Sequence, residues 1–234
     1  MSAIAQSMST TEALGVDSVF AKSVVDNAFS RLGGDSLLSA LRSIEDEIYL
    51  VGGAVRDALA GTDAPRDLDL MIPNFSTEPH RILRGLADGR QNRHGNWRYV
   101  LCDGLQIDVI EPRFFYRNFT SAAGALAYFD ASVNAIGFRI GDGCVLDPLG
   151  GARDLAKRRV TLPVARWSSM NDFESVHVTL RVARLLSRLA LKVVNPSLAL
   201  DQYSKFDLVD WTELERLNGV SRGRALEQVR LAFG

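Results

Sequence analysis

A chain of 234 residues with 47% hydrophobic side chains is long enough to bury the core of one domain and to carry a smaller second one. Its 27 basic and 28 acidic residues leave a formal net charge of -1, which excludes overall charge as the basis of nucleic-acid binding. No apolar run reaches the ~18 residues of a membrane span and no signal peptide is recognisable, so we expect a cytoplasmic chain that does not bind a membrane.

The first 14 residues are small and polar and are expected to be disordered. Apolar residues at helical spacing then predict a helix over 16–32, ended by a Gly-Gly pair, and a short helix over 35–43. From residue 48 the pattern changes to short apolar runs rich in strand formers, which alternate with turns and short helical stretches. Strands are predicted over 48–51, 68–72, 97–102, 106–110 and 144–146, an interrupted apolar segment over 133–138, and helices over 54–60 and 77–86.

The pattern becomes helical after Pro163. An apolar stripe from Val176 to Val193 predicts a long helix that Pro196 ends, and two further helical stretches are predicted over 197–203 and 212–231. The order of elements therefore predicts an α/β (α+β) fold, with a mixed-sheet head domain over 15–163 and a small all-helical neck domain over 164–234.

A glycine pair, Gly52 and Gly53, joins the first predicted strand to a helix. A strand that runs into glycines and then into a helix exposes backbone N–H groups, which suits a phosphate. Arg56 lies in the first turn of that helix and could add a charge-assisted hydrogen bond to the same group.

Asp67 and Asp69 lie two residues apart on the next predicted strand, so their side chains point to the same face. Two carboxylates on one face repel each other unless a cation lies between them. Magnesium prefers carboxylate and phosphate oxygens and is the expected ion, with manganese as the other candidate. A glycine pair alone usually marks only a turn, and an isolated Asp-x-Asp usually marks a solvated strand end, but the two together in strand–turn–helix–strand order are far more specific.

These residues carry a resemblance to a known family. VGGAVRDALAG followed by PRDLDL resembles the signature of the class II polynucleotide nucleotidyltransferases, which comprise the tRNA CCA-adding enzymes and the bacterial poly(A) polymerases. The segments NRHGNWRYVLCDGLQIDVIEPR, DASVNAIGFR, VLDPLGGARDL and LRVARLLSRLALKV resemble later segments of the same family. The resemblance covers residues 46–195, the head and part of the neck.

The resemblance implies a nucleotidyltransferase head domain that uses a nucleoside triphosphate (NTP) and magnesium. Asp67 and Asp69 would hold the metal, and Asp108 would assist as a metal ligand or base; an ordinary solvated strand residue is the alternative for Asp108. Asp130 would lie near the ribose or, alternatively, cap a helix or strand. The residues expected at the nucleotide are Gly52, Gly53, Arg56, Asp130, Arg181 and Arg184.

The sequence departs from the family at two places. Tyr128 and Phe129 stand where the family has two arginines, and could stack a base or ribose or else belong to the core. In the family's E-D-x-x-R template for base selection, which would fall at residues 174–178, Ser175 and Val178 replace the Asp and Arg. A valine cannot form the hydrogen bonds that select a base.

A basic stripe on the predicted long helix could follow a nucleic-acid backbone or a triphosphate, or could be the solvated face of the helix. Its members recur every three or four residues: His177, Arg181, Arg184, Arg188 and Lys192.

The function we expect is metal-dependent transfer of a nucleoside monophosphate from an NTP to a hydroxyl group, at an RNA (tRNA-like) 3′ end, with release of pyrophosphate. The 234 residues do not include the long body and tail of the full enzymes, and a partner chain or a homo-oligomer is one expected source of them. Two alternatives stay open: an enzyme that acts on a small molecule or a protein, and a non-catalytic relative that binds nucleotide or RNA.

Overall fold

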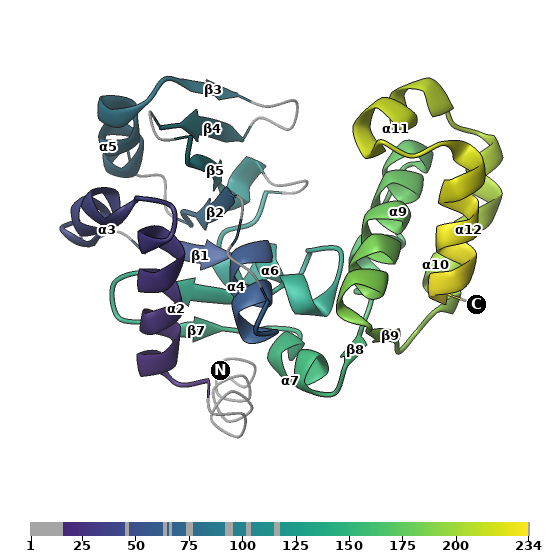
Figure 1. Ribbon diagram of the computed structural model, residues 1–234, viewed down its shortest axis with the longest axis horizontal. Helices are drawn as coiled ribbons and strands as arrows, with labels where there is room; N and C mark the ends of the chain where they lie inside the picture. Colours follow the sequence, from purple (N-terminus) through teal and green to yellow (C-terminus); the bar gives the residue numbers. More distant parts are fainter. Residues whose placement is uncertain are drawn as a thin grey trace.

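The structure of the protein is a computed structural model that describes residues 16–44, 47–62, 65, 67–73, 77–91, 96–101, 104–114 and 118–233. The expected disorder of residues 1–14 lies outside the described residues. Figure 1 shows a sheet with helices against it and, beside this, a group of helices that ends the chain. The mixed α/β fold class predicted from the sequence is confirmed by this arrangement.

Within the described residues, seven strands form one sheet in the order β3-β4-β5-β2-β1-β6-β7. β2 and β5 pair in parallel, and every other neighbouring pair is antiparallel. This is a mixed sheet in which β2 lies at the centre, between β5 and β1. The strands are β1 (Tyr49–Val51), β2 (Asp67–Met71), β3 (Gly89–Gln91), β4 (Trp97–Val100), β5 (Gln106–Ile110), β6 (Gly137–Arg139) and β7 (Val145–Leu146).

Side-chain alternation along β2 decides which of its residues reach the core. Leu68 and Leu70 are fully buried on one face, in the cluster that also contains Leu50 of β1. Asp67, Asp69 and Met71 take the opposite face, because successive side chains of a strand point to opposite sides. The alternation of residues in β2 thus places the leucines in the core and the carboxylates on the other face of the sheet.

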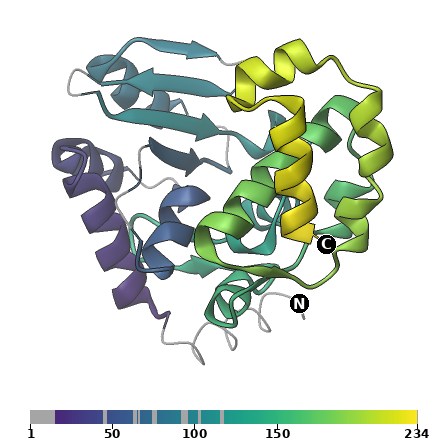
Figure 2. The same cartoon turned by 45° about the vertical axis from the view of Figure 1, so that its right-hand side comes forward.

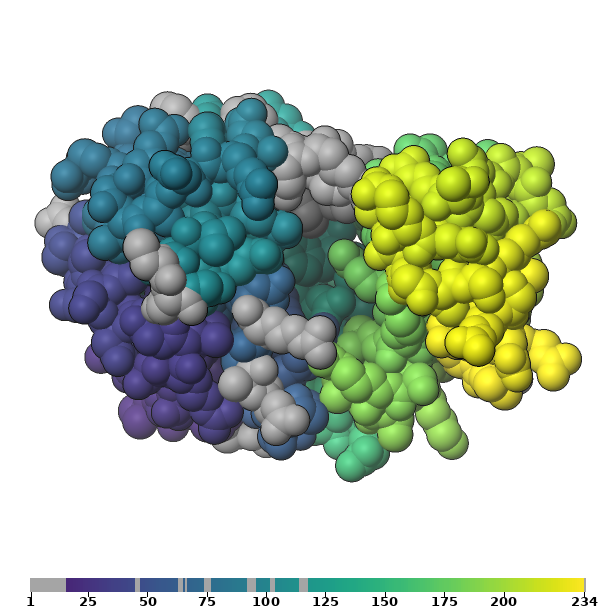
Figure 3. Space-filling model, turned by 45° about the horizontal axis from the view of Figure 1, so that its top comes forward, coloured from purple at the N-terminus to yellow at the C-terminus, as the bar shows by residue number. Residues whose placement is uncertain are grey.

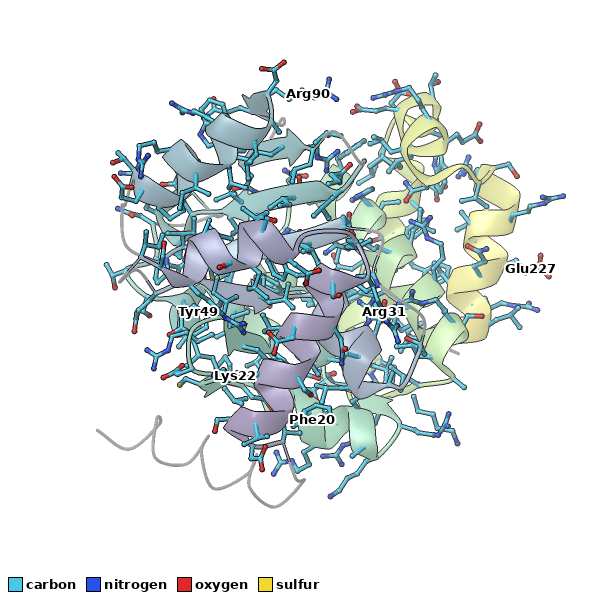
Figure 4. All side chains as sticks on the ribbon, turned by 60° about the vertical axis from the view of Figure 1, so that its left-hand side comes forward. Phe20, Lys22, Arg31, Tyr49, Arg90 and Glu227 are labelled. Carbon is cyan, nitrogen blue, oxygen red and sulfur yellow. The ribbon has the colours of Figure 1, made fainter. Side chains whose placement is uncertain are left out.

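Helices cover both faces. The leucine face of the sheet packs against helices whose apolar residues belong to the same core: α2 (Ser18–Ser30), α3 (Asp35–Arg42), α4 (Gly53–Leu59) and α5 (Glu78–Leu86). Figure 4 looks onto this layer, with α2 and α3 in front and the labelled side chains of Phe20 and Lys22 on α2. The other face carries a smaller cluster in which Val51 and Met71 pack with α6 (Ala122–Leu126).

The C-terminal helices share a separate apolar core around the long helix α9 (Asp172–Leu189). α12 (Arg222–Phe233) packs along α9, and the turned view of Figure 2 shows the two side by side. The remaining elements of this part are α8 (Val164–Trp167), α10 (Ser197–Leu200), η3 (Tyr203–Asp207) and α11 (Trp211–Asn218). Among the described residues, no helix combines the length and apolar character that crossing a membrane requires.

Residues on both sides of the expected boundary after Pro163 belong to this second core. Val160, in β8 (Arg159–Val160), and Leu162 are fully buried in the same cluster as Trp167. The division into domains at 15–163 and 164–234 therefore stays a prediction.

The predicted long helix is wrong beyond Leu189. Ala190 takes a left-handed conformation with φ of 50°, which ends α9, and β9 (Lys192–Val193) then pairs in parallel with β8. The single helical stretch predicted over 212–231 is also wrong, because Gly219 adopts a φ of 64° and separates α11 from α12. The apolar periodicity continued through Ala190 and concealed the first break, whereas Asn218-Gly219 was a visible signal for the second.

The left-handed residue that ends α9 gives a test of this boundary. Ala190→Gly should raise the free energy of unfolding by about 0.5–1 kcal/mol, because glycine takes a positive φ without strain. Ser187→Gly, at an exposed right-handed position one turn earlier, should lower it by about 0.5 kcal/mol. Urea unfolding measures both, and two changes of the same sign would contradict the helix end at Leu189.

Candidate active site

The turn between β1 and α4 requires glycine at residue 52 for two reasons. Gly52 has a φ of 70°, in the left-handed region where other residues are strained. A Cβ added to it would also lie 2.9 Å from Oδ2 of Asp69. The absence of a side chain at Gly52 therefore lets the Asp69 carboxylate lie against the turn.

Asp67 and Asp69 share one face of β2, as the sequence predicted. Asp67 is exposed, and Asp69 is half-buried beside the turn. Burial, and then the nearby carboxylates of Asp67 and Asp108, raise the pKa of Asp69 to about 7. This crowding of negative charge is the electrostatic situation that a divalent cation relieves.

Asp108 lies opposite Asp69 in the parallel pairing of β2 with β5. Both of its carboxylate oxygens accept hydrogen bonds from Arg98, at 2.7 Å from Nε and 2.7 Å from Nη2. The bidentate pair raises the pKa of the Arg98 guanidinium. In the described part of the chain, no group of three acidic, histidine or cysteine side chains is arranged to hold a metal.

Arg56 connects α4 to the short helix η2 (Ser132–Asn134). Its Nη1 donates to Oδ1 of Asn134 at 2.6 Å, and Asn134 Nδ2 donates to Oδ1 of Asp130 at 2.9 Å. Asp130 Oδ2 accepts from Arg181 of α9, at 2.8 Å from Nε and also from Nη2. Burial alone would raise the pKa of Asp130, but Arg181 and Asn134 hold it below its usual range.

The next two turns of α9 bring further arginines to the same place. Arg188 Nη2 donates to Oδ1 of Asp57 at 2.8 Å, and Arg184 donates to the backbone oxygen and Oδ1 of Asn218 at 3.2 and 2.7 Å. Burial, and then the neighbouring charge of Arg181, lower the pKa of the Arg184 guanidinium. Arginines of the predicted basic stripe therefore form hydrogen bonds with residues outside α9. The last expected member of the stripe, Lys192, lies in β9 and not in the helix.

These residues surround a cavity of about 360 Å³ between the glycine turn and α9. Figure 3 shows the surface hollowed between the sheet-bearing part of the chain and the green and yellow C-terminal helices. Of the residues expected to bind nucleotide, Gly52, Gly53, Arg56, Asp130, Arg181 and Arg184 line this cavity, together with Asp69, Phe129, Asn134, Val182, Leu185 and Arg188.

Sequence reasoning did not single out Asp57, Asn134 or Arg98. Asp57 directly follows Arg56, and Asn134 lies within the segment DASVNAIGFR, so adjacency to the motifs was the available signal. Arg98 lies within the segment NRHGNWRYVLCDGLQIDVIEPR, but its pairing with Asp108 depends on the register between β4 and β5, which the segment does not specify.

The two departures from the family have different places in the structure. Tyr128 is buried, packs against Phe119 and hydrogen-bonds Ser169, whereas Phe129 lines the cavity. At the template position, Ser175 and Val178 are buried in α9. Glu174 closes a capping box with Asn171, so it has a structural role at the start of α9.

Comparison with known proteins identifies the sheet-bearing region. Residues 48–161 match the model of the poly A polymerase head domain. Over these residues the chain belongs to the poly A polymerase head-domain family. The resemblance found in the sequence is thereby confirmed.

Curated relatives of this head-domain protein extend the match. A CC-adding tRNA nucleotidyltransferase of Deinococcus radiodurans is 32% identical over 77% of the chain and 52% of the relative. A multifunctional CCA protein of Nitrosococcus oceani is 31% identical over 80% of the chain and 48% of the relative. The chain thus spans about half the length of these relatives.

Solved structures show the same fold. A Thermotoga maritima CCA-adding enzyme complexed with tRNA aligns with a TM-score of 0.62 and 20% identity, over 82% of this chain and 45% of that one. A Bacillus stearothermophilus CCA-adding enzyme in complex with CTP aligns with a TM-score of 0.62 and 20% identity, over 86% and 48%.

Two glycines with similar φ values test the contact between the turn and Asp69. Gly52→Ala and Gly61→Ala should both lower the free energy of unfolding, since a non-glycine residue is strained at a positive φ, and Gly52→Ala should lower it more, because Gly52 combines a φ of 70° with a ψ of -130°. Only Gly52→Ala should also shift the NMR signal of the Asp69 carboxyl carbon, because nothing lies within 4 Å of a Cβ at Gly61. An unshifted Asp69 signal in Gly52→Ala would contradict the close approach.

The depressed pKa of Asp130 predicts how stability depends on pH. Since the folded pKa lies below the unfolded value of about 3.9, the Asp130 carboxylate stabilises the fold above that value and ceases to do so as the pH falls through the folded pKa. Asp130→Asn should therefore cost about 1–3 kcal/mol at pH 7 and progressively less below pH ~4. Unfolding curves of both proteins between pH 3 and 7 measure this, and a difference that does not change with pH counts against it.

Proposed function

We propose that this chain transfers a nucleoside monophosphate from an NTP to a hydroxyl at an RNA 3′ end and releases pyrophosphate. The observation that carries the proposal is a cavity lined by both carboxylate and arginine side chains. Asp69 and the glycine turn form one side, and Arg181, Arg184 and Arg188 of α9 form another. Opposed carboxylates and guanidinium groups suit a phosphate ligand that arrives with a divalent cation.

In this mechanism Asp67 and Asp69 would hold magnesium, with manganese as the alternative ion. Their shared face and the raised pKa of Asp69 support the choice of these two ligands. When bound, the ion supplies activation of the attacking hydroxyl and stabilisation of the leaving pyrophosphate.

The chain's other residues position the reactants. Arg56, Arg181 and Arg184 would neutralise and orient the triphosphate, and the glycine turn leaves room for it beside Asp69. Phosphoryl transfer needs little covalent help from a protein, so orientation and charge provide most of the rate enhancement. Phe129 lines the same cavity and offers a ring on which a base or ribose can stack.

The names of the relatives support an RNA acceptor, since one is a CC-adding tRNA nucleotidyltransferase. One observation favours a non-catalytic nucleotide-binding role instead: Arg98 occupies both carboxylate oxygens of Asp108. An enzyme with a small-molecule or protein acceptor is the third possibility.

Incorporation of label separates these functions. The chain is incubated with magnesium and each of the four labelled NTPs, together with a mixed RNA pool or an RNA-free cell extract. Label in RNA supports the proposal, and label in the protein or small-molecule fraction changes the acceptor. Nucleotide binding without incorporation of label and without release of pyrophosphate supports the non-catalytic binding role.

Single substitutions test the carboxylates. Asp67→Asn and Asp69→Asn should each lower incorporation by at least about a hundredfold, because each removes charge that holds the ion. Asp88→Asn, on an exposed residue before β3, should leave it unchanged. Equal activity in Asp69→Asn and the parent chain would refute the assignment.

Magnesium binding should also be visible without catalysis. Magnesium should raise the melting temperature of the parent chain and raise it less in Asp69→Asn, because the ion stabilises only the folded state that binds it. Thermal unfolding with magnesium and after EDTA treatment measures the effect. Identical shifts in both proteins would place the ion elsewhere.

A further inference from the structure

Asp57 is a buried carboxylate that receives arginines from two parts of the chain. Only 7% of the residue is exposed, and its Oδ1 accepts from Nε of Arg56 at 2.7 Å and from Nη2 of Arg188 at 2.8 Å. Arg56 is its neighbour on α4, while Arg188 lies 131 positions later in the sequence, near the end of α9. A buried carboxylate that lost these donors would be strongly destabilising, so its partners are held in place.

These contacts determine which atoms of Arg56 are available. Nε is committed to Asp57 and Nη1 to Asn134, which fixes the plane of the guanidinium at two points. In the described part of the chain, Nη2 of Arg56 makes no hydrogen bond. It faces the glycine turn, since a Cβ built on Gly53 would lie 3.5 Å from it. Arg56 therefore presents one donor group to the cavity in a fixed orientation.

The same contacts close a polar ring that returns to α9. We use polar ring for the hydrogen-bonded series that consists of Arg181, Asp130, Asn134, Arg56, Asp57 and Arg188. Its two ends, Arg181 and Arg188, are seven residues apart on α9 and thus on the same face, about 10.5 Å apart along the axis. The glycine turn and the α9 arginines are consequently held in one arrangement around the cavity.

We infer that Asp57 and Arg188 are positioning residues, which orient Arg56 toward the triphosphate and couple the affinity for NTP to the placement of α9. The inference rests on the proposed function for the identity of the ligand, and it deepens that function by assigning two residues outside the catalytic carboxylates. Arg188 acts through Asp57, and Asp57 acts through Arg56. The chemistry of the ligand is that of an inorganic or nucleoside triphosphate.

Arg188→Gln and Asp57→Asn should each weaken binding of ATP and of inorganic tripolyphosphate, both with magnesium, by about tenfold, the contribution of one charge-assisted hydrogen bond. Isothermal titration calorimetry on the full chain measures the binding. Where transfer is observed, the KM for the NTP should rise by the same factor while kcat changes less than threefold. Arg188→Lys keeps the charge and should recover most of the affinity.

The double variant Asp57→Asn/Arg188→Gln tests whether the two residues act in series. It should bind no more weakly than the weaker single variant, because both single changes break the same contact. Arg224→Gln, which removes an exposed arginine of α12, controls for the loss of one positive charge and should bind as the parent chain does.

Three results would overturn the inference. The first is unchanged tripolyphosphate affinity in Arg188→Gln and Asp57→Asn, and the second is a loss of affinity in the double variant that equals the product of the two single losses. The third is a lower melting temperature with normal affinity, which would show that the two residues have only a structural role. Failure of the proposed function looks different. Binding that responds to these variants without any incorporation of label refutes the transfer reaction and leaves the positioning role standing. A parent chain that binds neither ATP nor tripolyphosphate refutes both.

Discussion

Crowding of negative charge at the start of β2 is the constraint on which the site depends. Asp69 is half-buried, shares a face with Asp67 and lies in register with Asp108 of β5, so it has two neighbouring carboxylates where two strands run in parallel. Burial and these neighbours raise the pKa of Asp69 to about 7. The fold offsets the charge from two sides: Arg98 binds Asp108 within the sheet, and the field of Arg181 reaches Asp69 from α9.

The offset from α9 makes the C-terminal helices part of the site. Arg181 neutralises the buried Asp130, and Arg188 neutralises the buried Asp57, so the helix is joined to the sheet-bearing region by two carboxylates that need a partner. An exposed ion pair contributes little to stability, but a buried carboxylate left unpaired costs much more. The position of α9 beside the cavity and the charge balance of the cavity therefore depend on the same two ion pairs.

The residues that differ from the family pattern fit this account. Tyr128 is a core residue, and Ser175 and Val178 face the interior of the C-terminal helices, so the positions of the family's base-selecting pair offer no polar edge to the cavity. Phe129 and the arginines of α9 line the cavity instead. Arg184, whose guanidinium donates to Asn218, is one of the polar side chains of that lining.

The sequence alone determined the local elements whose cause is local. The same-face placement of Asp67 and Asp69 and the strands around them follow from a spacing of two residues, and the helices from a spacing of three to four. The Gly52–Gly53 turn and the family resemblance rest on the residues of the motifs themselves. The break at Ala190 could not be read this way, because alanine gives no sign of a left-handed conformation, whereas Asn218-Gly219 was a helix-ending signal that the predicted helix over 212–231 did not take into account. Only the tertiary structure decided that Asp108 is paired with Arg98, that Asn134 joins Arg56 to Asp130, and that Arg188 reaches Asp57 across 131 positions. The physical reason is that a charge selects its partner by distance in space, and that distance is set by strand register and helix packing rather than by position in the sequence.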